Sequence, residues 1–339
     1  MEKNKKQLDQ LSPDLFQRKL SDGEAAEKIQ KPSLSFWKDA WIRLLKNKGA
    51  IAGLIMLVIL ILMAIVGPYM TGRDYSDQNI RHAKLPPKIE TLSFIPWFDG
   101  KDGDGFDVYE SRKIEENYWF GTDDLGRDLF TRTWQGTRIS LYIGILAAVI
   151  DFLIGIAYGG ISGFYGGRID DIMQRIVEIL VGIPNLVVVI LFILVFDPGI
   201  FSITMAMVIT GWVTMARIVR GQILQQKNQE YVLASQTLGA TNNRLIFKHL
   251  LPNVMGPVII TTMFTVPSAI YTEAFLSFIG LGIQPPLASL GSLVNEGYRS
   301  IQSFPHMMMI PSVVISLVIL SFNLLADGLR DALDPKMRK

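Results

Sequence analysis

Long uncharged apolar runs constrain this chain more than any other feature of its sequence. The clearest covers residues 50–66 and ends at Gly67 and Pro68. With its flanking residues it reaches the ~20 residues that an α-helix needs to cross about 30 Å of hydrocarbon. Since lipid cannot satisfy the polar groups of irregular backbone, each such run is expected to be helical. The sequence therefore predicts an all-α polytopic membrane protein with six transmembrane helices, the other five at 139–164, 176–196, 199–219, 254–282 and 307–328.

The distribution of basic residues predicts the orientation of these helices. With the N-terminus inside, 22 of the 33 lysines and arginines fall in cytoplasmic segments, which agrees with the positive-inside rule. The first run begins too late in the chain to belong to a secretory signal peptide. We expect both termini to be cytoplasmic and the first helix to remain in the membrane.

The segments between and beside the apolar runs complete the expected organisation. Residues 1–32 are polar and aperiodic, which is typical of a flexible cytoplasmic tail. Residues 33–48 place Trp37, Trp41 and Leu44 on one stripe, which favours an amphipathic helix at the membrane interface; alternatively, this segment simply begins the first span. The remaining parts are the first transmembrane helix (49–70), an extracytoplasmic loop (71–138), a core of five transmembrane helices (139–328) with a cytoplasmic loop at 220–253, and a cytoplasmic tail (329–339).

Motifs for bond-making chemistry are missing from the sequence. There is no cysteine, which excludes disulfides, thiolate metal sites and cysteine nucleophiles. No phosphate-binding loop, zinc-protease motif or serine-hydrolase motif occurs, and His82, His249 and His306 are expected at the surface. The acidic run at 99–107 has the wrong spacing for a calcium-binding loop. We predict no catalytic residue, metal or cofactor in this chain and no nucleic-acid partner.

The cytoplasmic loop carries a helical segment with exposed apolar candidates. A short helix is expected over residues 230–238, broken at Gly239, where a glycine permits positive φ. A second helix from about Asn242 leads back to the membrane and is expected to be interrupted at Pro252. Two interpretations remain equally open, a docking element for another protein and an ordinary connector. The residues of the first helix that favour docking are Glu230, Tyr231, Val232, Leu233, Ala234, Ser235 and Leu238.

Four glycines recur at every fourth position around the second apolar run. They are Gly155, Gly159, Gly163 and Gly167, and small residues at this spacing let two helices pack closely in lipid. We expect this face to pack within the subunit or against a partner; a flexible gating role is the alternative.

Three carboxylates fall inside predicted spans, where an ionisable group costs about 2.5–3.5 kcal/mol on insertion scales. Glu273 is the preferred candidate for the substrate path, because it lies mid-span and could pair with a cationic group. The alternative interpretation is that Glu273 is a buried carboxylate with a structural role. Glu178 could pair with Arg175, three residues away, and Asp151 could equally hold a contact between helices.

Four ordered blocks resemble one family. The loop resembles the cytoplasmic loop of ABC-importer permeases, in which Glu-Ala-Ala, three residues and Gly precede a Leu-Pro pair. Gly239 matches the glycine, Leu251 and Pro252 match the pair, and residues 233–235 align with the triplet, so Glu230 would replace its glutamate. The blocks at 118–128, 276–286 and 323–335 resemble the C-type subunit of oligopeptide and dipeptide permeases.

This resemblance implies a type I ABC-importer permease fold in a bacterial cell membrane. It implies a second homologous permease subunit of the B type, two cytoplasmic ABC ATPases that bind ATP and Mg, and an extracytoplasmic peptide-binding protein. The loop that couples the permease to an ATPase would then contain Glu230, Tyr231, Val232, Leu233, Ala234, Ser235, Leu238, Gly239, Leu251 and Pro252.

Two other classes of protein compete with a permease subunit. A secondary transporter would act without an ATPase, but the internal repeat expected of such transporters is not evident. An intramembrane enzyme would need a nucleophile with its base, or a metal cluster, within the spans, and the sequence offers neither.

Overall fold

The computed structural model describes residues 35–102 and 104–334 of the chain. The chain divides into two units, residues 1–39 and 40–339, which we describe separately. The predicted tail at 1–32 and the end of the predicted C-terminal tail, residues 335–339, lie outside the described residues. Of the first unit, residues 36–39 form the start of helix α3 (Phe36–Leu44).

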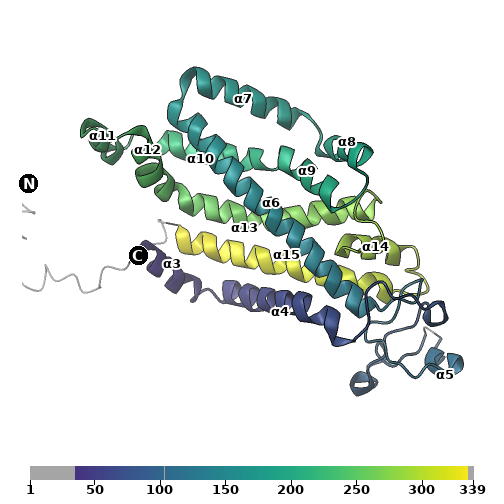
Figure 1. Ribbon diagram of the computed structural model, residues 1–339. Coiled ribbons are helices and arrows are strands. Elements are labelled where there is room, and N and C mark those ends of the chain that lie inside the picture. Colours follow the sequence, from purple (N-terminus) through teal and green to yellow (C-terminus); the bar gives the residue numbers. More distant parts are fainter. Residues whose placement is uncertain (1–34, 103, 335–339) are drawn as a thin grey trace, which may run out of the picture. The chain divides into compact units, whose positions relative to one another are not determined.

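The second unit is built from long apolar helices, as predicted (Figure 1). Five segments are long and apolar enough to cross a membrane: α4 (Lys48–Met70), α6 (Leu129–Tyr165), α9 with α10 (Ile200–Gln226), α12 to α13 (Asn242–Phe278) and α15 (His306–Leu333). A sixth results if α7 (Gly167–Gly182) and α8 (Asn185–Phe196) are counted as one span. The prediction of an all-α polytopic membrane protein is therefore confirmed.

The shorter elements join these helices. Between α4 and α6 lie η2 (Ile80–His82), η3 (Glu90–Leu92) and α5 (Val108–Arg112). The segment Ile200–Gln226 consists of α9 (Ile200–Thr210) and α10 (Trp212–Gln226), which is followed by α11 (Glu230–Thr237). The next long helix comprises α12 (Asn242–Arg244), the π-helical segment η4 (Leu245–Leu250) and α13 (Leu251–Phe278). Helix α14 (Leu290–Tyr298) precedes α15.

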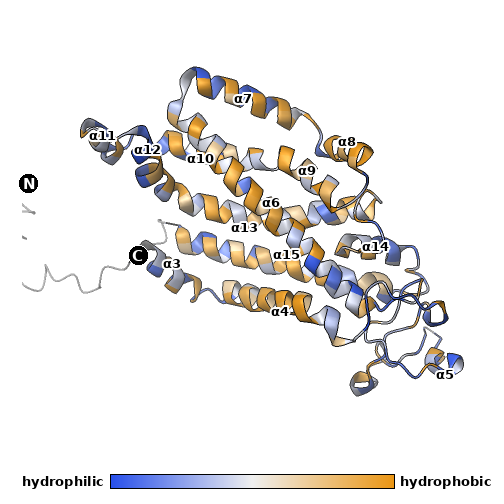
Figure 2. Cartoon of the chain, viewed as in Figure 1, coloured by the Kyte–Doolittle hydropathy of each residue, from blue (hydrophilic) through white to orange (hydrophobic). Residues whose placement is uncertain are grey.

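The membrane-facing character of these helices is plain in their exposed side chains. Figure 2 shows α4 and α8 hydrophobic over most of their length. On α4, Ile55, Ile59 and Leu62 are each more than half exposed, whereas Ala50, Leu57 and other residues of the opposite side are buried against neighbouring helices. A helix that exposes large apolar side chains on one side and packs the other fits a position at the edge of a bundle in lipid.

The predicted span at 176–196 is not a single straight helix. Helices α7 and α8 meet at an angle of 80°. Pro184 immediately precedes α8, and Ile183 before it has an extended backbone with φ −89° and ψ 121°. The proline ring disfavours helical geometry at the preceding residue and supplies no N–H, so the helix ends there.

The predicted interfacial helix at 33–48 is also shorter than expected. Helix α3 ends at Leu44, and α4 begins at Lys48 after Asn47, whose side chain accepts hydrogen bonds from the backbone N–H groups of Gly49 and Ala50. Asparagine is a favoured N-cap, so a new helix starts here. In the second unit, Leu44 is buried in the main core cluster while Trp41 is exposed.

Helix α6 packs against α10 through the glycines at every fourth position. A Cβ atom on Gly155 would lie 2.5 Å from the Met215 side chain, one on Gly159 would lie 2.3 Å from the Ala216 carbonyl oxygen, and one on Gly163 would lie 2.9 Å from Ile223. Gly167 does not belong to this face, contrary to the prediction. It follows the end of α6, has a φ of +52°, and a Cβ there would meet nothing within 4 Å.

Replacing Gly159 with alanine tests this packing. The added Cβ would press on the Ala216 carbonyl oxygen, so we expect the free energy of unfolding to fall by about 1–3 kcal/mol. Gly160→Ala is the matched control, because a Cβ at the next residue meets nothing within 4 Å. Thermal unfolding of both purified variants in one detergent measures the difference. Equal melting temperatures would contradict the close approach of α6 and α10.

Candidate functional site

A cavity of about 540 Å³ lies between the long helices. Its walls come from α6, the break between α7 and α8, the junction of α9 with α10, and α13. Apolar side chains such as Phe264 and Leu180 share this lining with an amide, Asn185, and with hydroxyl groups. The hydroxyl-bearing residues of the lining are Thr210, Thr214, Thr261, Thr265, Ser268 and Thr272. A mixed lining of this volume suits a small polar solute.

Asp151 is the one ionisable residue in this lining. It lies in the middle of α6 and is 7% exposed. Its carboxylate lies over Gly211 at the α9–α10 junction, where a Cβ atom would come within 2.5 Å of Asp151 Oδ1. The structure gives Asp151 no hydrogen bond or ion pair with any residue it describes. The sequence offered no means of distinguishing this carboxylate from one that holds two helices together.

Glu273, the candidate preferred from the sequence for the substrate path, does not line this cavity. Its side chain is fully buried between α6, α13 and α14. Ser140 Oγ donates to one carboxylate oxygen at 3.0 Å and Ser277 Oγ donates to the other at 2.7 Å, while Ser289 Oγ lies 3.2 Å from Ser277 Oγ. Glu273 therefore corresponds to the structural alternative, a carboxylate satisfied by neighbouring hydroxyls.

Two ion pairs involve helix α7. Arg175 and Glu178 pair at 2.9 Å on its exposed side, as the spacing suggested. Asp170 accepts two hydrogen bonds of 2.6 Å from Arg220 of α10, in a forked arrangement, and a further one from Ser162 of α6. This second set joins α7 to α6 and α10. Asp170 and Arg220 are fifty positions apart in the chain, so no local sequence pattern indicated this contact.

The loop between α10 and α13 contains the expected short helix and turn. Helix α11 covers Glu230–Thr237, and Gly239 has a φ of +80°. Val232 does not offer an outward anchor, contrary to expectation. It is buried among Ile223 of α10, Leu245 of η4 and Val254 of α13, and so it attaches α11 to the rest of the protein.

The outward surface of this loop is apolar at several positions. Tyr231, Leu233 and Leu238 are exposed, and Leu238 is 87% exposed. The Tyr231 hydroxyl donates to Gln226 Oε1 at 2.7 Å and accepts a bond from Asn253 at 3.2 Å, which braces the helix from both sides of the loop. Glu230 forms no ion pair with a residue in the described ranges.

The helix after this turn is not interrupted at Pro252. The π-helical segment η4 precedes α13, and Pro252 lies in the first turn of α13, next to Leu251. Proline lacks an N–H and its ring crowds the carbonyl of the residue four positions earlier. A wider turn, in which the Leu251 N–H donates to the Ile246 carbonyl, accommodates it without ending the helix.

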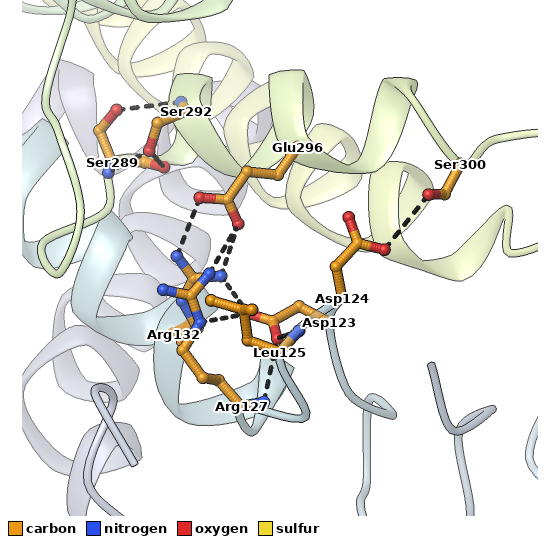
Figure 3. Close-up of polar contacts among 9 residues, drawn as sticks. All are labelled: Asp123, Asp124, Leu125, Arg127, Arg132, Ser289, Ser292, Glu296 and Ser300. Carbon is orange, nitrogen blue, oxygen red and sulfur yellow. Dashed lines mark hydrogen bonds and ion pairs between the residues drawn. The ribbon is translucent and has the colours of Figure 1, made fainter. Parts of the chain in front are cut away.

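A buried charge network connects the loop before α6 to α14 (Figure 3). Arg132 is completely buried and contacts both Asp123 and Glu296, the latter at 2.6 Å. Arg127 Nε lies 2.6 Å from Asp123 Oδ2, and its guanidinium also reaches Glu296 at 3.3 Å. Helix α6 begins at Leu129, ten residues before the predicted start at 139, and Arg132 lies in its first turn. Its buried partners compensate the charge that the helix carries there.

The same loop has a small core of its own around Tyr118. This core contains Leu85, Tyr109, Ile114 and Tyr118. Burial raises the pKa of Tyr118 to about 12, so the phenol is neutral and can donate to Glu116 at 3.1 Å. Its hydroxyl also lies 2.7 Å from His82 Nδ1. His82 and His306 are both buried, so the prediction that they lie at the surface was wrong.

Together these features define a polytopic membrane protein with a cavity of mixed polar and apolar lining among its helices and a braced loop with exposed apolar side chains. The model of the "binding-protein-dependent transport system inner membrane component" family matches residues 155–339. A second model, the N-terminal TM domain of oligopeptide transport permease C, matches residues 35–87. The chain belongs to this transport family, as a multi-pass component of the bacterial inner membrane.

Full-length relatives narrow the match further. The chain is 49% identical over 332 residues to the oligopeptide transport system permease protein OppC of Bacillus subtilis, covering 98% of this chain and 100% of that one. It is 47% identical over 339 residues to the dipeptide transport system permease protein DppC of Bacillus subtilis, and the match covers 100% of this chain and 98% of that one. The predicted resemblance to C-type oligopeptide and dipeptide permeases is confirmed, and the alternative of a secondary transporter gains no support.

Solved structures agree on the fold. A permease chain from inward-facing crystal forms of the MetNI methionine ABC transporter is 18% identical, with a TM-score of 0.51 over 60% of this chain and 96% of that one. A second crystal form of the same transporter gives 17% identity and a TM-score of 0.50, and the match covers 59% of this chain and 95% of that one. The shared part is therefore the ABC-importer permease fold.

Removing Arg132 tests the buried network. Arg132→Gln would leave the buried Asp123 carboxylate short of charge compensation, and we expect a loss of about 3–5 kcal/mol in the free energy of unfolding. Arg175→Gln is the control, because its pair with Glu178 is exposed (81% and 55%) and such pairs contribute about 0–1 kcal/mol. Thermal unfolding in detergent distinguishes them. A similar small loss in both variants would argue against a structural role for the network.

Proposed function

We propose that this chain is a permease subunit of an ATP-driven importer of oligopeptides or dipeptides. The observation that carries the proposal is the match to relatives named as oligopeptide and dipeptide permeases over 98–100% of this chain. Such a subunit performs no bond chemistry of its own. It provides half of a path across the membrane, and the energy comes from ATP and Mg bound by other subunits.

The importer would contain a second homologous permease of the B type, two cytoplasmic ABC ATPases and an extracytoplasmic peptide-binding protein. In this arrangement both termini and the loop containing α11 face the cytoplasm. The loop between α4 and α6, with the network around Arg132, faces the opposite side. The cavity beside Asp151 would lie on the path of the peptide, and the lipid bilayer would surround the remaining helices.

Helix α11 is suited to couple an ATPase to this path. Its outward residues Tyr231, Leu233 and Leu238 are exposed, while Val232 fixes the helix to α10 and α13. Both α10 and α13 line the cavity. A displacement of α11 by a docked ATPase would therefore be transmitted to two walls of the cavity as a movement of packed helices. The positive φ of Gly239 sets the direction in which the chain leaves α11.

The proposed docking surface can be tested at its most exposed residue. Leu238→Asp would place a charge in an apolar interface, so we expect the amount of ATPase that copurifies with the permease to fall by about tenfold or more. Ile80→Asp is the matched control, since Ile80 is 78% exposed in the loop between α4 and α6. Quantitative mass spectrometry of the purified complex measures the yield of each subunit.

Three outcomes are informative. Loss of ATPase from Leu238→Asp alone supports docking through α11. Unchanged copurification and unchanged peptide-stimulated ATP hydrolysis would remove α11 from the coupling mechanism. If no ATPase copurifies with the unmodified chain from its native membrane, the proposed function itself fails.

A further inference from the structure

We propose that Asp151 binds the ammonium group of the transported peptide inside the membrane cavity. This inference rests on the proposed function, because it names the chemical group that the path would recognise. An ammonium group is found at the amino terminus of a peptide and on a lysine side chain, and both present N–H donors with a positive charge.

The first observation is that Asp151 has no polar partner among the residues that the structure describes. It is more than nine-tenths buried, it lines the cavity, and it has no hydrogen bond or ion pair with any residue in the described ranges. The other acidic side chains that are buried in the described ranges have partners: Glu273 has serine hydroxyls, Asp170 has Arg220, Asp123 has two arginines, and Asp128 has Thr131. An unpaired carboxylate at this depth is costly, so a cationic occupant of the cavity would relieve that cost.

The second observation is the direction of the hydroxyl groups around it. On α13, Thr261 Oγ donates to the Pro257 carbonyl at 2.9 Å, Thr265 Oγ to the Thr261 carbonyl at 3.2 Å, and Thr272 Oγ to the Ser268 carbonyl at 2.9 Å. Their protons are used within the helix. The oxygen atoms can therefore only accept further bonds, which favours a ligand rich in donors.

The third observation is the charge of the cavity. Asp151 is the only ionisable group that lines it, and neither lysine nor arginine is among the lining residues. The lining therefore combines one negative charge with the acceptor oxygens of Thr261, Thr265 and Thr272 in a partly enclosed space, where electrostatic attraction is stronger than in water. Gly211 contributes by its lack of a side chain, because a Cβ atom there would occupy the place of the carboxylate.

The test uses the complete importer in proteoliposomes with three peptides: trialanine, N-acetyl-trialanine, and N-acetyl-Ala-Lys-Ala. The unmodified complex is expected to import the two peptides with an ammonium group faster than N-acetyl-trialanine. Asp151→Asn should reduce that preference by roughly tenfold or more, since a charge-assisted hydrogen bond is lost. Asp151→Glu should retain it. Because one binding protein serves every variant, its own selectivity cancels in the comparison.

Glu178→Gln is the matched control, because it removes an exposed carboxylate on α7, which is paired with Arg175. It should leave the preference unchanged. If Asp151→Asn loses the preference for trialanine alone, the site binds the amino terminus of the peptide. If it loses the preference for both peptides, the site binds any ammonium group. An unchanged preference in Asp151→Asn, or none in the unmodified complex, would overturn the inference. Equal loss of import for all three peptides, with the second permease subunit still present in the complex, would also overturn it.

A measurement on the unmodified complex covers the case in which Asp151→Asn does not assemble. A carbodiimide modifies carboxyl groups in apolar surroundings, and mass spectrometry locates the product. Trialanine should slow modification of Asp151 several-fold relative to N-acetyl-trialanine. Equal rates, or no modification of Asp151, would overturn the inference. Failure of the unmodified importer to transport any of the three peptides would instead refute the proposed function.

Discussion

The close contact between α6 and α10 is the feature on which the cavity depends. Three glycines of α6 bring the two helix backbones together without intervening side chains. The contact continues along α6 to Asp151, which lies over Gly211 where α9 meets α10. A glycine on α10's side makes room for the carboxylate, just as the glycines of α6 make room for α10. The packing that joins the helices therefore also places a charged group in the cavity wall.

The loop before α6 depends on a different interaction. Its own small core is fixed to the long helices by arginines that share carboxylates from Asp123 and Glu296. Glu296 is on α14, 164 positions beyond Arg132. A buried ion pair is a weak source of net stability, but removing one partner leaves the other without compensation. An ion-pair network with this property is suited to hold the loop before α6 in one position relative to α14.

Local signals allowed much of the fold to be predicted. Apolar runs indicated the long helices, and glycine with its preference for positive φ indicated the end of α11 at Gly239. Helix α7 ends before Pro184, but the chain is not interrupted at Pro252 as predicted, and Pro267 and Pro311 also lie inside continuous helices, α13 and α15. The difference is local: Pro184 has an extended residue before it, whereas Pro252 follows a π-helical turn that accepts its ring.

Features that depend on distant partners could not be predicted. Arg132 lies within the segment predicted as a loop, and its ion pairs with Asp123 and Glu296 account for its burial in α6. Val232 resembled an exposed anchor until α10 and α13 were seen to enclose it. The family resemblance identified the loop and the blocks around it, but it gave no information about which side chains in the spans face the cavity.

The carboxylates show most directly why a function within the membrane requires the structure. Asp151 and Glu273 are equivalent in the sequence: each is an acidic residue in an apolar run. Glu273 was the better candidate by its position in the span, yet Ser140 and Ser277 satisfy it within the protein. A carboxylate with such partners has little to gain from a ligand, because binding would have to replace bonds already made. Asp151 has no such bonds within the described ranges, and three threonine hydroxyls in the lining of the same cavity can only accept further bonds. The free-energy cost of burying the Asp151 carboxylate is therefore the one that a cationic substrate can offset.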